Sequence, residues 1–410
     1  MATDAPPLLL DAPGDRAPGV GAGVGQRGYL DFLSLFRIVA CAAVVAQHSF
    51  IWTNMTGNFV GTGFITMLHL SRNSFFFLTG LVVCYSQTTR PRPLGRFWKR
   101  RYLEIGVPYL VWTGIYLVFT LVTVSATWDQ VGTFLRHNLL LGFSQMYAVI
   151  VIFQFYLVFP LLLMLLRSTR RHALVMTVSL AFAALVGFAL HYPAWFGLSG
   201  VNGSINRVWP WGRDFFVYQE FFVAGTLVAL HLDRVLAFVA RRYRQIMLCT
   251  VAIGILTVLW YQISVWTGSS VEQASDIYEP MATLWCLAAI AGIFSLSWWW
   301  HQRTAAGNGA AQRRTLYLAG LTGGIFFSHT LFLNMFRGAL GATGLRDHLP
   351  WPATVAILFV TGIAAAGLLV SVELLTPLRW VLGGPVRSEQ RRRVNAVAAA
   401  AATRLHLRPS

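Results

Sequence analysis

The chain has 410 residues, of which 56% are hydrophobic and only 11% are charged, and its mean hydropathy is +0.58. Soluble domains carry about 25% charged residues, so this composition excludes an ordinary soluble domain and predicts an all-α, polytopic membrane protein. The formal net charge of +17 would indicate a nucleic-acid partner in a soluble protein, but here the basic residues first have to be assigned to loops.

The two ends of the chain differ in composition from the rest. Residues 1–27 are rich in Ala, Gly and Pro and contain no long apolar run, which predicts a disordered cytoplasmic tail. Aspartates and the lack of a basic first segment argue against a cleaved signal peptide. We therefore expect a transmembrane domain over residues 28–383 and a basic cytoplasmic tail over 384–410.

Ten apolar segments follow the first tail, each close to the ~20 residues that a helix needs to cross a bilayer. They cover residues 30–52, 66–87, 104–125, 147–166, 172–191, 214–231, 246–266, 280–300, 316–337 and 353–375. The sequence thus predicts about ten transmembrane helices.

Most of the 32 lysines and arginines fall in alternate loops and in the two tails. By the positive-inside rule this places both termini in the cytoplasm and predicts a multi-pass protein of the cell inner membrane. The acidic loop with Glu272, Asp276 and Glu279 then lies outside. The basic residues are expected to face membrane lipids, and no nucleic acid is expected as a partner.

The first apolar segment carries Arg37 and, eleven residues later, His48. On a helix this spacing gives about 16 Å of rise and side-chain directions within ~20° of each other. A cation inside a lipid-embedded helix costs roughly 3 kcal/mol unless it faces protein or water, which favours a polar track on the inner face. The alternative is that Arg37 extends to the near interface and that His48 is a packing residue.

Other polar groups interrupt later segments. Arg72 is either an interfacial anchor or a site residue, and Gln154 is typical of a helix–helix hydrogen bond. Glu220 is expected to face water or a cation, and His329 either lines a site or is structural. The four cysteines show no metal-ligand spacing, so no metal site is predicted.

Arginine, ten residues and histidine in the first span resemble the signature of the acyltransferase 3 family, which comprises ten-helix bacterial enzymes that O-acylate envelope sugars, lipids and secondary metabolites. Four more motifs agree in order, and the resemblance covers residues 29–380. They are Phe75–Gly80, Phe97–Arg101 continuing to Pro108, Gln154–Tyr156 with Pro160, and Gly324–Ile325 with His329. The sequence around Arg72 and Tyr147 most closely resembles the subgroup of enzymes that modify polysaccharide intercellular adhesin.

The sequence departs from the family pattern at two positions. Glu104 stands where many relatives have an arginine, so one basic group of the family pattern near the donor phosphates is replaced by an acidic one. Thr79 replaces the usual serine and still supplies a hydroxyl.

The resemblance implies a donor, an acceptor and residue roles. The donor is a cytosolic acyl-CoA, with acetyl-CoA or another short-chain form expected, and no permanently bound cofactor is implied. Lys99, Arg100 and Arg101 pair with the donor phosphates. Alternatively, these basic residues only set the orientation of the protein in the membrane.

The acceptor is a hydroxyl of a glycan, a glycolipid or another envelope molecule. His48 acts as general base or transient acyl carrier, and Arg37 holds the donor end or orients the site. Arg72 contacts the acceptor. The remaining polar positions, Thr79, Gln154, Glu220 and His329, are expected to line the site.

Another class of protein also fits ten helices with an internal polar track, namely an exporter or flippase of an envelope polysaccharide or glycolipid. Such a transporter needs neither an acyl donor nor an essential histidine, and it favours paired broken helices near mid-membrane. A purely structural or sensory membrane protein leaves the charge in the first span unexplained.

Overall fold

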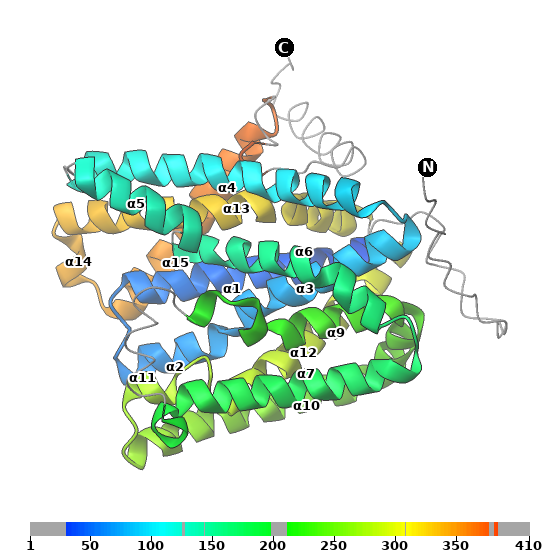
Figure 1. The fold of residues 1–410 in the computed structure, drawn as a ribbon. Coiled ribbons are helices and arrows are strands. Elements are labelled where there is room, and N and C mark those ends of the chain that lie inside the picture. Colours follow the sequence, from blue (N-terminus) through cyan, green and yellow to red (C-terminus); the bar gives the residue numbers. More distant parts are fainter. Residues whose placement is uncertain are drawn as a thin grey trace.

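The computed structural model describes residues 30–124, 128–142, 144–197, 211–307, 309–376 and 381–383. Within these residues the protein is built of helices, without strands (Figure 1). The long helices are α1 (Ser34–Trp52), α3 (Leu70–Thr89), α4 (Leu94–Val124), α5 (Trp128–Leu141), α6 (Tyr147–Leu165), α7 (Arg170–His191), α10 (Leu232–Trp266), α12 (Pro280–Gly307), α13 (Gly309–Ala342) and α15 (Trp351–Glu373).

Shorter elements connect these helices. They are α2 (Phe59–Leu68), α9 (Gln219–Leu230), α11 (Val271–Ala274), α14 (Leu345–His348) and five 3-10 turns: η1 (Asp31–Leu33), η2 (Ser144–Met146), η3 (Pro193–Phe196), η4 (Trp211–Arg213) and η5 (Phe215–Val217). The predicted tails, residues 1–27 and 384–410, lie outside the described residues, so that division of the chain stays a prediction.

The described residues contain nine helices, with α2 and α3 counted together, that are long and apolar enough to cross a membrane. They confirm the predicted all-α polytopic fold, while the cytoplasmic placement of the termini stays a prediction. The predicted segment at 214–231 differs, because its helix α9 has only 12 residues. At 1.5 Å per residue α9 rises about 18 Å, well short of a ~30 Å hydrocarbon core.

A side chain of α6 forms hydrogen bonds with backbone groups of the non-helical segment that precedes α9. The Gln154 amide donates to the Arg213 carbonyl over 2.8 Å and accepts the Phe215 N–H over 2.9 Å. Backbone groups inside a membrane protein need such partners when they leave a helix. Hydropathy alone did not reveal this interruption, because η5 is as apolar as a helix.

The helices α3 and α9 cross in direct backbone contact near the centre of the molecule (Figure 1). A Cβ atom added at Gly80 would lie 2.2 Å from the Phe222 carbonyl oxygen, and one at Gly225 would lie 2.0 Å from that of Phe77. Both positions therefore require glycine. The glycine that ends the Phe75–Gly80 motif thus has a packing role, and it fixes α3 against α9.

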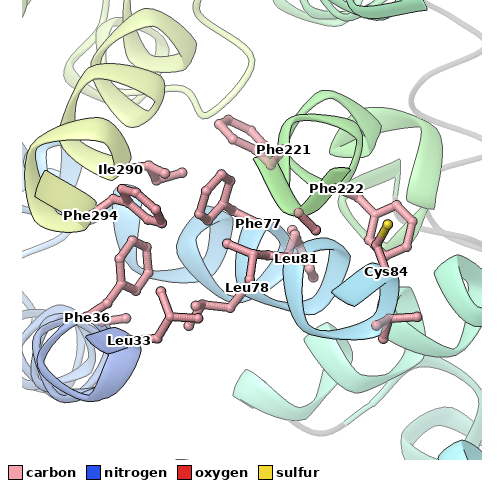
Figure 2. Close-up of a cluster of buried hydrophobic side chains, with 14 of the residues drawn as sticks. Leu33, Phe36, Phe77, Leu78, Leu81, Cys84, Phe221, Phe222, Ile290 and Phe294 are labelled. Carbon is pink, nitrogen blue, oxygen red and sulfur yellow. The ribbon is translucent and has the colours of Figure 1, made fainter. Parts of the chain in front are cut away.

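The main core fills the space around this crossing. Phe77 of α3 packs against Phe36 of α1 and Phe294 of α12, with ring centroids 5.8 and 6.1 Å apart (Figure 2). Phe221 and Phe222 approach from α9, and Phe222 stacks on Phe155 of α6 at 4.4 Å. These contacts hold α1, α3, α6, α9 and α12 in one unit.

Central and peripheral helices differ in burial. The apolar window of the α2–α3 span and that of α13 are each 61% buried within the protein, whereas those of α7 and α10 are 6% and 17% buried. Polar side chains on α3 and α13 are therefore mostly enclosed by protein, whereas α7 and α10 have apolar residues on the outside of the bundle, as expected for helices that contact lipid. Gly324 lets α13 approach α15, since a Cβ there would lie 2.4 Å from the Val370 side chain.

Candidate active site

Three helices begin around one cavity. They are α3, which follows a break after α2 at His69, α6, which follows η2, and α9, which follows η5. The cavity has a volume of about 370 Å³. It is lined by His48, Ile51 and Trp52 of α1, by Arg72, Ser144 and Tyr147, and by Gly212, Arg213, Tyr218 and Ile277.

His48 faces this cavity and forms no hydrogen bond with any described residue, so its ring nitrogens are available to a ligand. Its nearest ring neighbour is His329 of α13, at 5.2 Å between centroids and a 56° tilt. An imidazole that is positioned by packing yet open to a cavity suits proton transfer to or from a bound hydroxyl.

His329 itself is fully buried and held in place. Its Nδ1–H donates to the Ile325 carbonyl over 2.9 Å, and Thr330 Oγ1 lies 3.4 Å from its Nε2. The Thr330 hydroxyl donates to Gln145 over 2.5 Å, and Gln145 donates to the Tyr116 hydroxyl over 3.2 Å. This network fixes the ring against which His48 packs.

A second network sets the start of α3. Gln47, next to His48, accepts a hydrogen bond from Ser71 over 2.9 Å, and its Nε2 lies 3.3 Å from His69 Nδ1. His69 Nε2 lies 3.0 Å from the Ser275 carbonyl oxygen and donates to it. These bonds tie the α2–α3 break to α1, so they place Arg72 at a fixed position relative to His48.

Arg72 and Arg213 both lie close to the ring of Tyr147. Arg72 donates to the Tyr147 hydroxyl over 2.7 Å, and its guanidinium carbon lies 4.5 Å from the centre of the Tyr218 ring. The guanidinium carbon of Arg213 lies 5.9 Å from the centre of the Tyr147 ring. Burial lowers the pKa of Arg213, and the nearby tyrosines oppose that effect. The cavity therefore combines an open imidazole with two cations.

Comparison with protein families gives one match. The model for an acyltransferase domain, Acyl_transf_3, matches residues 30–371, which is most of the chain. The chain belongs to the acyltransferase 3 family. No curated protein and no solved structure matches it.

In this acyltransferase, the structure brings together three of the residues selected from the sequence: His48, Arg72 and His329. Arg37 is half-buried near the other end of α1 and does not line the cavity. Thr79 donates to the Phe75 carbonyl of its own helix over 2.7 Å. Gln154 supports the backbone before α9, as described above.

Glu220 is 2% exposed on the first turn of α9, and its Oε2 has no hydrogen-bond partner among the described residues. It borders the cavity region without lining the cavity. It comes two residues after Tyr218, a lining residue, which puts a carboxyl group near the cavity wall.

Lys99, Arg100 and Arg101 lie in the first turns of α4, which follows the far end of α3. Arg72 is 17 residues before Thr89, the last residue of α3, so about 26 Å of helix separates the basic cluster from the cavity. Glu104 pairs with Arg100 at 2.6 Å and with Arg101 at 3.5 Å. The residue that departs from the family pattern thus contacts two of the predicted donor-binding side chains.

Arg213 was not among the site residues selected from the sequence. The signal that points to it is local: Arg213 follows Trp-Pro-Trp-Gly, a run typical of a structured loop. Gly212 allows this loop to approach Tyr278, whose hydroxyl would lie 3.3 Å from an added Cβ. Arg213 then donates to the carbonyls of Leu141 and Gly142, which joins the loop to the α5–α6 break.

Proposed function

We propose that this membrane acyltransferase moves a short acyl group, with acetyl as the expected one, from cytosolic acyl-CoA to a hydroxyl of an envelope glycan, glycolipid or related acceptor. The observation that supports it best is the open imidazole of His48 in a cavity that also holds Arg72. The finer resemblance, to enzymes that modify polysaccharide intercellular adhesin, stays a prediction.

In the proposed reaction, His48 accepts the proton of the acceptor hydroxyl as its oxygen attacks the thioester carbon. A C–O bond forms, and the carbonyl oxygen becomes an anion that the guanidinium of Arg72 stabilises. The C–S bond then breaks, and the proton passes from the imidazolium of His48 to the leaving thiolate of CoA. His329 is a positioning residue, because it packs against His48 and is itself fixed by hydrogen bonds.

On the donor side, Lys99, Arg100 and Arg101 bind the phosphates of CoA at the cytoplasmic start of α4. Arg37 lies on α1 between that end and His48, about 16 Å from the latter by helical rise. Its expected role is to attract the anionic donor or to orient it along α1. By the positive-inside rule the cavity opens toward the outer side, where the acceptor lies.

The experiment compares the full-length protein with two histidine variants in purified membranes that contain acetyl-CoA and a cell-envelope extract. We expect His48→Ala to lower ester formation and CoA release at least about 100-fold, the usual contribution of a general base. His348→Ala, at an exposed histidine of α14, is the matched control and should keep full activity. Full turnover by His48→Ala would refute the assignment.

An exporter or flippase is the second candidate, because interrupted helices around a polar cavity are also typical of transporters. The same membranes distinguish the two functions. An exporter consumes no acetyl-CoA and leaves no new ester mass on envelope glycans when cells with and without the gene are compared. The two routes of transfer can also be distinguished, by an acid quench of the reaction followed by mass spectrometry. Detection of a covalently acylated His48 would show that the acyl group passes through an acyl-histidine intermediate and is not transferred directly.

A further inference from the structure

Two guanidinium groups, of Arg72 and Arg213, line the cavity of His48, and neither forms an ion pair within the described residues. None of the residues that line this cavity is acidic. The buried Glu220 lies behind the wall and also forms no ion pair there. The lining of the cavity is therefore positively charged and contains no acidic residue, and the nearest buried carboxyl group, that of Glu220, lies outside the lining.

Both arginines keep donors free for a ligand. A guanidinium has five N–H donors. Arg72 uses Nη1 on Tyr147 and Nε on Asn73, over 2.7 and 3.5 Å. Arg213 uses Nη1 on the carbonyls of Leu141 and Gly142. In both residues the Nη2 group forms no hydrogen bond with a described residue.

Both cations contact the same aromatic ring. The centre of the Tyr147 ring lies 5.9 Å from each guanidinium carbon, and the centre of the Tyr218 ring lies 4.5 Å from that of Arg72. Contacts with aromatic faces stabilise guanidinium groups without neutralising them. Two cations in one partly desolvated cavity repel each other, and a bound anion removes that cost.

We propose that the acceptor carries an anionic group, a carboxylate or a phosphate, which binds to Arg72 and Arg213 and presents a neighbouring hydroxyl to His48. This inference rests on the proposed function and names its acceptor class: an acidic sugar or a polyol phosphate rather than a neutral glycan. Arg213 is then a specificity-determining residue that binds the anion and takes no part in proton transfer.

The test measures binding separately from turnover. The purified full-length protein in nanodiscs is titrated with methyl glucuronide and with methyl glucoside, and sn-glycerol 3-phosphate is compared with glycerol. A charge-assisted hydrogen bond contributes about 1.5–3 kcal/mol, so at least one anionic probe should bind roughly tenfold or more tightly than its neutral partner. Equal affinity within both pairs overturns the proposal.

Variants connect that preference to the site. Arg213→Gln should abolish the preference for the anionic probe, and Arg213→Lys should retain part of it. Arg136→Gln, which removes an exposed arginine of α5, should leave it unchanged. If Arg213→Gln unfolds because its bonds to Leu141 and Gly142 are lost, Arg72→Gln is the second variant. A preference that survives in a folded Arg213→Gln or Arg72→Gln protein overturns the proposal.

A carboxylate in this cavity could also belong to a dicarboxylic acyl group. Transfer from acetyl-CoA and from succinyl-CoA distinguishes the two sources. If only succinyl-CoA is used, and Arg213→Gln removes that selectivity, the anion belongs to the donor and the acceptor proposal is wrong. If the anionic probes bind the wild type but no acyl-CoA is consumed, the acyl-transfer function fails while the anion site stands.

Discussion

Replacement of Gly80 by alanine tests how the helix crossing supports the cavity. The added Cβ would lie 2.2 Å from the Phe222 carbonyl oxygen, about 1 Å inside normal contact, and 3.1 Å from the Thr226 backbone nitrogen. Both atoms are backbone, so α3 and α9 have to separate. Overpacking of this kind costs roughly 1–3 kcal/mol, against a gain of about 0.5–1 kcal/mol from replacing a helical glycine.

We therefore expect Gly80→Ala to lower stability by about 1–2 kcal/mol and to weaken acceptor use, because Arg72 on α3 and Tyr218 before α9 move apart. Thermal unfolding of the purified protein and KM for the acceptor measure these effects. Gly114→Ala in α4 is the matched control, since its added Cβ would meet no atom within 4 Å apart from its chain neighbours and the backbone of its own helix. If Gly80→Ala matched Gly114→Ala in both measurements, the packing argument would be wrong.

Three further predictions concern single side chains. Glu104→Gln should lower KM for acyl-CoA several-fold, because it releases Arg100 and Arg101. Glu272→Gln, which changes an exposed carboxylate, is the control, and a raised KM for Glu104→Gln would contradict the reasoning. Tyr147→Phe removes the 2.7 Å bond to Arg72 and should raise KM for the acceptor about tenfold with little change in kcat, whereas an unchanged KM would count against the role of Arg72. Burial, His172 and Arg234 lower the pKa of His231 from its usual 6.5, so the folded state disfavours the charged form of this histidine. The unfolding temperature should therefore be highest above pH 6.5 and should fall as the pH is lowered below it. His231→Gln should make this fall in unfolding temperature smaller.

Much of the helical framework follows from the sequence because a span needs a long apolar run and little else. The predicted segments at 30–52, 147–166, 172–191 and 353–375 agree with the structure to within a few residues. Hydropathy does not report where a helix begins within an apolar run, and this is why α9 was expected to be longer. The break depends on Gln154, which lies in another helix.

The candidate site shows the same division between local and long-range information. His48 is recognisable because an ionisable group in a span is costly wherever it lies. The Trp-Pro-Trp-Gly run before Arg213 indicates a structured loop, but it does not reveal a site residue, since an arginine in a loop costs nothing until tertiary contacts bring it into the protein. Its hydrogen-bond partners, the carbonyls of Leu141 and Gly142, are 72 and 71 positions away in the sequence. A local sequence pattern does not predict contacts between residues so far apart in the chain.

The interrupted helices explain why the cavity forms where it does. Continuous spans would fill the level of His48 with apolar side chains, because each would pack against its neighbours along its whole length. Here α3, α6 and α9 begin at that level, and the segments before them supply Arg213 and Tyr218 as wall residues. Irregular backbone at membrane depth is tolerated where it is buried in protein or lines a wet cavity. Filling the cavity, for example by Gly212→Leu, would therefore remove the space for a substrate while leaving His48 in place. We expect this variant to lose acyl transfer and to keep its helical content, and a variant with normal acyl transfer would contradict the reasoning.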